Sequence, residues 1–76
     1  MDQDELADRI AQAGDERWTT LDLSGEGLKY LPPKIGGLTA LTRLDLYLNQ
    51  LTALPPGMKQ LIDQGVVKLS GNPLRG

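Results

Sequence analysis

A repeat of 23 residues constrains this chain more than any other feature of its sequence. Three columns of leucine or valine recur at that interval: Leu21, Leu44 and Val67; Leu23, Leu46 and Leu69; Leu28, Leu51 and Leu74. Leu31 and Leu54 also match, and each precedes two prolines. Neither the period of a helix nor that of a strand persists through a whole repeat. An interval of about 20 to 29 residues is typical of proteins built from stacked coils.

Each repeat contains a short segment in which apolar residues alternate, namely TLDL, RLDL and VKLS. Stacking would place these segments side by side as parallel strands about 4.8 Å apart, with their leucines turned inward. The prolines begin a return limb that we expect to be extended or tightly turned, not helical, because proline has a fixed φ and no N–H. We expect four further apolar residues to pack the convex side: Ile35, Leu38, Met58 and Leu61.

Asn49 and Asn72 share a column in which the first repeat has Glu26. An asparagine amide both donates and accepts, so it can satisfy the backbone groups of a sharp inward turn, and a buried group left unpaired costs about 1 to 3 kcal/mol. We therefore interpret the asparagines as a fold-making ladder in preference to a ligand site. The exception at Glu26 is expected of an outermost coil, which lacks a neighbour on one side.

The full pattern, L-x-x-L-x-L-x-x-N-x-L over residues 18–74, resembles the leucine-rich repeat family. The stretch LPPKIGGLTALTRLDLYLNQLTALPPGMKQL is similar to the intracellular subtype whose coils read L-P-x-x-I-x-x-L-x-x-L, found in bacterial proteins and in the arrays of Roco proteins. The resemblance implies an α/β fold, a short right-handed leucine-rich repeat solenoid with a parallel concave sheet and an N-terminal capping helix.

The amino-terminal residues 1–17 are predicted to form that capping helix, and residues 18–76 the solenoid of two full coils and a partial third, in one domain. Asp2 and Glu5 have the spacing of a capping box, and Gly14 is expected to stop the helix. Leu6, Ile10 and Ala13 share one face, which with Trp18 would cover the first coil. Docking of this helix on a partner or membrane is the alternative, but its acidic face would be repelled by anionic lipid.

The carboxyl end is predicted to be open. Gln64 stands where the previous coil has a leucine, and no closing helix follows the last repeat. The alternative is that Gln64 forms a partial polar cap, which would argue against a long continuing array. An edge strand from Val66 to Leu69 would offer unpaired N–H and C=O groups. We expect such an edge to pair with a second copy, giving a homodimer, or with a downstream segment.

The composition of the 76-residue chain excludes several classes of protein. It has no cysteine and no histidine, so disulfides, a structural zinc site and the usual catalytic thiols and bases are missing. Its net charge of −2 is unevenly divided, with an acidic front and a mildly basic remainder, but it contains no basic stripe, which argues against nucleic-acid and membrane partners. The acidic start, MDQDELADRI, is unlike a signal peptide, so we predict a cytoplasmic location.

The best enzyme-like arrangement is the pair Asp22 and Asp45, which the register places on adjacent strands. Two close carboxylates can split their pKa values as in acid–base sites. Here the pair would be open to solvent, with Lys68 next in the row. The segment GEG at Gly25 lacks the context of a nucleotide-binding loop and predicts a turn. We therefore predict no enzyme activity, no cofactor and no metal site.

The outward columns of the sheet are the candidate partner-binding site. They are predicted to be Thr20, Arg43 and Val66; Asp22, Asp45 and Lys68; and Ser24, Tyr47 and Ser70. Tyr47 and Leu48 stand out because the other repeats have Ser-Gly there, and tyrosine and arginine are enriched in interface hot spots. The alternative is that Tyr47 merely covers a neighbouring coil. The predicted concave binding face is Thr20, Asp22, Arg43, Asp45, Tyr47, Leu48 and Lys68.

These features favour a protein–protein interaction module that binds a protein or peptide through its concave sheet. Two alternatives stay open. The chain is a self-associating minimal solenoid completed through its carboxyl-terminal edge, or it is a fragment of a larger signalling protein such as a Roco-like GTPase or kinase. The sequence identifies neither the partner nor the pathway.

Overall fold

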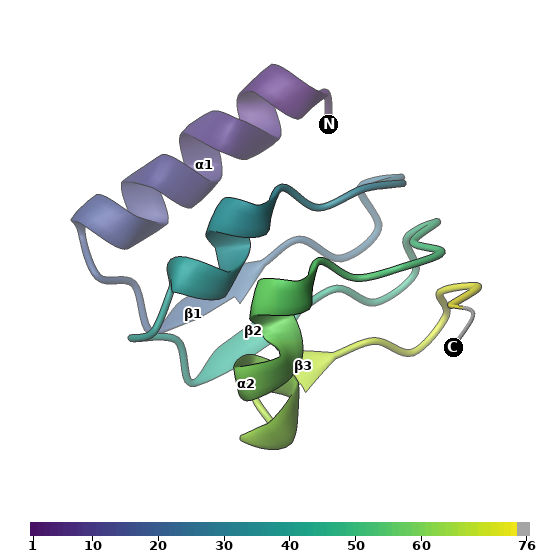
Figure 1. The fold of residues 1–76 in the computed structure, drawn as a ribbon. Coiled ribbons are helices and arrows are strands. Elements are labelled where there is room, and N and C mark those ends of the chain that lie inside the picture. The colour runs from purple at the N-terminus through teal and green to yellow at the C-terminus, as the bar shows by residue number, and fades with distance from the viewer. Residues whose placement is uncertain (75–76) are drawn as a thin grey trace.

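Three short parallel strands and their helical return limbs make up the computed structural model, which describes residues 1–74 (Figure 1). In chain order the elements are helix α1 Gln3–Asp15, strand β1 Thr20–Asp22, 3-10 helix η1 Pro33–Gly37, strand β2 Arg43–Asp45, 3-10 helix η2 Pro56–Met58, helix α2 Lys59–Asp63 and strand β3 Val67–Lys68. The sheet order is β1-β2-β3, with all pairs parallel. The structure is therefore a small α/β fold, as predicted.

The strands pair in the register that the repeat predicts. Leu21 lies opposite Leu44, and Leu44 lies opposite Val67. The ladder continues beyond the strands, because the Leu23 N–H donates to the Asp45 carbonyl at 2.8 Å and the Leu46 N–H to the Lys68 carbonyl at 2.9 Å. Equivalent segments of the three repeats thus run side by side (Figure 1).

A core made largely of leucine fills the space between the sheet and the return limbs. Its fully buried side chains include Leu23, Leu44, Leu46, Ile35 and Met58. Full burial of one such side chain stabilises the fold by about 1.5 to 3 kcal/mol relative to exposure. Ile35, Leu38, Met58 and Leu61, predicted to pack the convex side, are all buried.

Helix α1 lies across the first coil and closes that end of the core. Its N-cap is Asp2, whose carboxylate accepts a hydrogen bond from the Glu5 N–H at 2.7 Å. The predicted apolar face is buried at Leu6, Ile10 and Ala13, and Trp18 packs half-buried against the same core.

The prediction that Gly14 stops α1 is wrong. The helix continues to Asp15 and is capped at Glu16. Arg17 takes the left-handed conformation, with φ of 53°, and the Trp18 N–H then donates back to the Ala13 carbonyl at 2.9 Å. This is the Schellman closure, in which the residue after the C-cap needs positive φ. Gly14 lies too early in the sequence to take that place.

The return limbs are more helical than expected. Pro32 and Pro55 are extended, but the second proline of each pair begins a 3-10 helix. Proline is tolerated at a first helical position because its missing N–H would have no partner there. In the second limb the chain continues into the α-helical turn α2, which the prediction also missed.

The carboxyl-terminal strand is shorter than predicted and begins one residue later. β3 is Val67–Lys68, whereas Val66 is buried and not part of the outward row. The Val66 N–H donates to the Leu61 carbonyl at 3.1 Å, which ties this residue to the end of α2. Within residues 1–74 the structure contains no helix with the length and apolar character needed to span a bilayer.

Candidate functional site

The sheet face turned away from the leucine core carries the predicted binding residues of the three strands, whereas Tyr47 and Leu48 lie in the turn after β2. We call this face, together with that turn, the outer sheet face. Thr20 lies opposite Arg43, and Asp22, Asp45 and Lys68 form one row across the three strands. Thr20, Asp22 and Arg43 are exposed. Asp45 and Lys68 are half-buried beside their neighbours.

An ion pair at the centre of this face fixes Arg43. Its Nε donates to both carboxylate oxygens of Asp45, at 3.0 and 3.1 Å. The hydrogen bond and the charge of Asp45 raise the pKa of Arg43 above its ordinary value. The arginine side chain is 53% exposed and that of Asp45 14%, so the pair orients the guanidinium without removing it from solvent.

Asp22 has a separate partner in the turn that follows its own strand. Its Oδ1 accepts from the Ser24 hydroxyl at 2.6 Å and from the Ser24 N–H at 3.0 Å. These hydrogen bonds, the hydroxyl first, hold the pKa of Asp22 below its ordinary value. Asp22 and Asp45 therefore share a row but are each satisfied by a different residue.

Leu48 is the most unusual residue of the site. It is 71% exposed, yet its backbone is left-handed, with φ of 58°. The equivalent positions of the other repeats are Gly25 and Gly71, with φ of 66° and 82°. A left-handed conformation costs a residue with a Cβ about 1 to 2 kcal/mol. The fold therefore demands positive φ at this corner of every coil, and the middle coil meets it with a large side chain.

The alternative role for the Tyr47–Leu48 pair is to cover a neighbouring coil, and the contacts of Leu48 test it. Tyr47 is half-buried. The Leu48 Cδ2 lies 2.7 Å from where a Cβ on Gly71 would stand, so the leucine extends over the corner of the third coil. Covering of a neighbouring coil thus occurs at Leu48, but most of that side chain is still exposed to solvent.

Below Leu48, the predicted asparagine ladder is confirmed. Asn49 is 5% exposed, and its Oδ1 accepts from the Glu26 and Leu28 N–H groups at 3.0 Å. Its Nδ2 donates to the Leu23 and Leu46 carbonyls at 2.9 and 3.1 Å. Asn72 repeats the pattern one coil later on the Leu51 N–H and the Leu46 and Leu69 carbonyls. The ladder holds the corner that presents Leu48.

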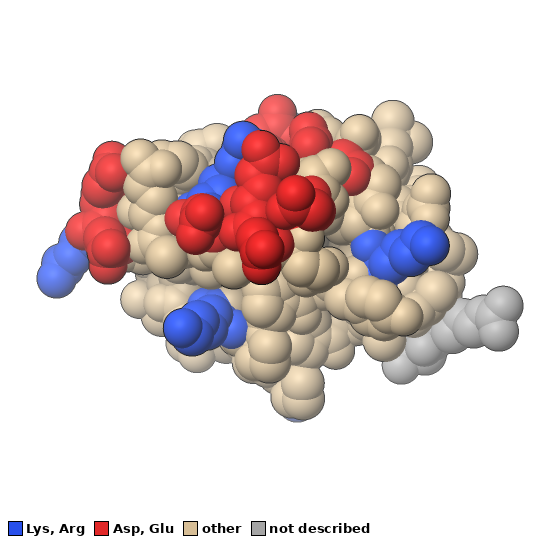
Figure 2. All heavy atoms as spheres, turned by 90° about the horizontal axis from the view of Figure 1, so that it is seen from above, with Lys and Arg blue, Asp and Glu red and all other residues tan. Residues whose placement is uncertain are grey.

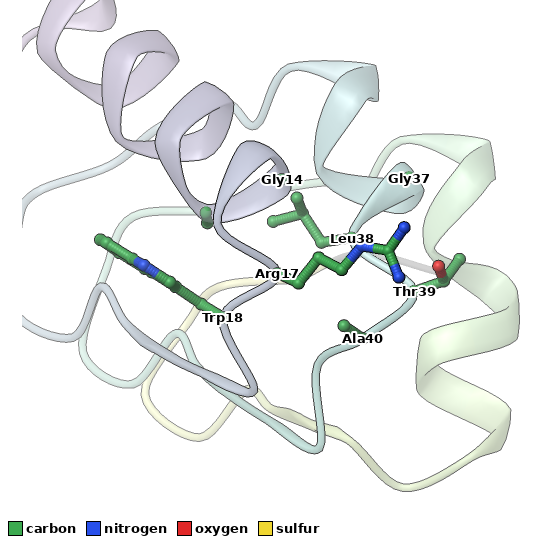
Figure 3. Close-up of a pocket in the computed structure, with 8 residues that line it drawn as sticks. Gly14, Arg17, Trp18, Gly37, Leu38, Thr39 and Ala40 are labelled. Carbon is green, nitrogen blue, oxygen red and sulfur yellow. The ribbon is translucent and has the colours of Figure 1, made fainter.

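A hollow of about 430 Å³ lies where α1 meets the loop after η1 (Figure 3). Arg17 stretches across it toward Thr39, whereas the Trp18 ring points away in the opposite direction (Figure 3). The Trp18 Nε1 donates to Glu16 at 3.2 Å. Among the described residues that line the hollow, Arg17 is the single cation. The carboxyl end of α1 carries the negative pole of the helix dipole, which opposes anion binding.

Two surfaces flank the sheet face. The exposed side of α1 is acidic, and Figure 2 shows its carboxylates gathered along the helix. At the carboxyl-terminal end, an apolar groove of about 490 Å³ runs between the second return limb and the third coil, lined by Leu54, Ile62 and Leu74 among others. In the part of the chain that the structure describes, no three Asp, Glu, His or Cys side chains converge to hold a metal ion.

Comparison with known proteins finds a partial similarity. No family model matches the chain. Over 59 residues it is 41% identical to the CCR4-Not complex 3'-5'-exoribonuclease subunit Ccr4 of Debaryomyces hansenii. The matched segment is 78% of this chain but 7% of that protein. The chain thus spans a small fraction of the relative's length.

Sequence reasoning named the residues of the outer sheet face but missed two features. The strained backbone of Leu48 was signalled by the glycines at 25 and 71, because a column of glycines indicates positive φ. The 40% exposed Ile62 of the apolar groove was signalled by its column, where the first coil has Thr39. An apolar residue in a polar column marks a surface that differs between coils.

Proposed function

We propose that this chain is a short leucine-rich repeat solenoid that acts as a non-enzymatic interaction module and binds a protein or peptide through the outer sheet face. The 23-residue register and the asparagine ladder support the solenoid.

The single observation that carries the binding role is Leu48. A leucine held at positive φ is strained, and its 71% exposure means that burial within the chain does not fully offset the strain. Glycine meets the same backbone demand in both neighbouring coils. Strain that the limited packing of Leu48 over Gly71 compensates only in part favours a functional reason. The neighbouring Tyr47 and the oriented Arg43 of the same coil are residue types enriched in interface hot spots, and the exposed leucine adds apolar area to the same face.

The same geometry supports a binding role over a catalytic one. A general acid needs a raised pKa, whereas hydrogen bonds from Ser24 lower that of Asp22. Asp45 is committed to Arg43. The relative's name describes a subunit of a complex, which agrees with an assembly role for a segment of this kind. The exoribonuclease activity in that name belongs to the relative and is not proposed for this chain.

Selection of peptides from a random display library against the immobilised chain tests the proposal. Selected peptides are then titrated against Tyr47→Ala and Leu48→Gly. Tyr30→Ala is the matched control, because Tyr30 is 69% exposed and lines a hollow with Gln50 and Thr52, which are not part of the proposed site. We expect the first two variants to weaken binding at least about tenfold, as hot-spot truncation does, and the control to bind normally. Equal binding by all variants would place the site elsewhere.

A further inference from the structure

The carboxyl-terminal end of the stack presents an apolar surface and an open sheet edge. Val66, Lys68 and Ser70 accept hydrogen bonds from the second coil through their carbonyls. Main-chain groups alternate sides along a strand, so those of Val67 and Leu69 point to the opposite edge, where residues 1–74 supply no further strand. Val67, Leu69 and Leu74 are only half-buried there. The other end of the core is closed by the apolar face of α1.

Beside this edge lies the apolar groove, bounded by α2. Lys59 and Ile62 line it, and Asp63 is one turn after Lys59. Residues three and four apart share one face of a helix. The exposed face of α2 is therefore positive, apolar and negative in turn along its axis.

A further coil cannot stack here with the geometry that joins the first two. In that contact Gly36 approaches the backbone of Gly57 so closely that a Cβ on Gly36 would lie 2.6 Å from the Gly57 carbonyl oxygen. One repeat later the position of Gly36 is held by Lys59. The Lys59 side chain would therefore collide with a coil added in the same way, which argues against head-to-tail continuation of the array.

We propose that a second copy of this chain occupies this end, related by a two-fold axis, with β3 paired antiparallel to its counterpart and the two α2 helices antiparallel across the groove. In that arrangement Lys59 of each copy faces Asp63 of the other, so the charge pattern of α2 is complementary to itself. A two-fold interface is isologous and closes at two copies. The apolar residues of the groove and edge then meet their equivalents, and the open edge is paired. This surface meets the outer sheet face at β3, which carries Lys68, but it does not include Tyr47 or Leu48.

Sedimentation equilibrium over a hundredfold range of concentration tests the proposal on the 76-residue chain. We expect a monomer–dimer equilibrium that stops at two copies. Lys59→Glu would set two carboxylates against each other at each charge contact, and Asp63→Lys would set two ammonium groups against each other. Each variant should raise the dimer dissociation constant about tenfold, given the modest strength of exposed ion pairs. Lys34→Glu, a charge reversal in η1 outside the groove, should leave dimerisation unchanged.

The decisive measurement is an equimolar mixture of the two groove variants. In a mixed dimer the glutamate introduced in one copy faces the lysine introduced in the other, and the unchanged Asp63 of the first copy faces the unchanged Lys59 of the second. The mixture should therefore recover the dimer that the separate variants lose. A mixture that associates no more strongly than its components would overturn the proposal.

Two further measurements distinguish a weakened dimer from an unfolded chain and from a general effect of charge. Circular dichroism confirms that each variant is folded, and Ile62→Gln, at a 40% exposed site, should weaken the dimer without a change of charge. A monomer at all concentrations of the unaltered chain, or growth beyond two copies, would also overturn the proposal.

Discussion

At Leu48 the chain accepts a strained backbone, which lowers its stability, and gains an exposed apolar side chain. Replacement by glycine removes the Cβ that is strained at φ of 58°, while little buried area is lost. We expect Leu48→Gly to raise the free energy of unfolding by about 1 kcal/mol, the strain relieved being partly offset by the greater freedom of glycine in the unfolded chain. Urea unfolding followed by circular dichroism measures the change.

Leu48→Ala is the matched control for that prediction. Alanine keeps the Cβ and its strain while removing the rest of the side chain, so it should not be stabilised. A glycine variant no more stable than the alanine variant would show that the corner is not strained, and the main argument for an anchor at Leu48 would be lost.

Asn49 is the residue on which the loop ladder depends most. Alanine at this position would leave the Glu26 and Leu28 N–H groups and the Leu23 carbonyl without their side-chain partner. We expect Asn49→Ala to lower the free energy of unfolding by about 3 kcal/mol or more, because each buried group left unpaired costs about 1 to 3 kcal/mol. Thermal and urea unfolding measure it. Asn72→Ala, at a half-buried site, should cost less, and equal losses would contradict the ladder interpretation.

Asp22 makes stability depend on pH. Its pKa is lower in the folded chain than its ordinary value of 3.8, so its contribution is fully present above that value and is lost as the pH falls through the folded pKa. Ser24→Ala removes the hydroxyl donor that lowers the pKa most. We expect an NMR titration of the Asp22 carboxyl to show a higher pKa in this variant. An unchanged titration would mean that the hydroxyl does not bind the carboxylate.

At the scale of elements, contact between the two return limbs depends on a single missing Cβ. A methyl group on Gly36 would lie 2.6 Å from the Gly57 carbonyl oxygen, which is backbone and cannot rotate away. We expect Gly36→Ala to lower the free energy of unfolding by about 2 kcal/mol, within the range for overpacking. Gly37→Ala is the control, since its Cβ would meet nothing within 4 Å. Equal stability of the two variants would show that η1 and η2 can separate without cost.

The elements also show how far the sequence could predict the fold. The strand register followed from the repeat because a 23-residue offset aligns every inward leucine at once, as in Leu21, Leu44 and Val67. The end of α1 did not follow, because its Schellman closure uses Arg17 and not the nearby glycine. Helix α2 was missed because the prolines before it indicate a turn, whereas the second proline occupies a first helical position. Tertiary packing, and not the local conformational preference of the residues, decides where α1 ends and whether α2 forms.

The candidate site, too, could be predicted from the sequence only in part. The row Asp22, Asp45, Lys68 could be placed from the register alone. The partners of those side chains could not, because Arg43 bonds within its own strand to Asp45 and Asp22 bonds to Ser24. Val66 was predicted to lie in the outward row but does not, because its N–H donates to the Leu61 carbonyl at the end of α2. Register fixes which residues are neighbours, but side-chain rotamers and loop closure decide which of them interact.

For the whole molecule, α1 is a part of the core and not a detachable cover. A chain of 76 residues buries only about 60% of its unfolded surface, and Leu6 is fully buried in the cluster that joins the helix to all three coils. We expect Leu6→Ala to lower the free energy of unfolding by about 3 kcal/mol, a typical cost for deleting a buried leucine. This loss of stability should affect all elements of the chain and not α1 alone.

Amide hydrogen exchange distinguishes shared loss from local loss. If the chain unfolds as one unit, Leu6→Ala should reduce protection equally for the amides of α1 and for Leu44 in the central strand, with unfolding still two-state. Ala11→Gly is the control, because Ala11 is exposed on the same helix and its replacement costs only about 1 kcal/mol of helix propensity. Loss of protection confined to α1 would mean that the coils fold without their helix. It would also mean that the stack tolerates an uncovered end, which would remove the need for a second copy to cover the other one.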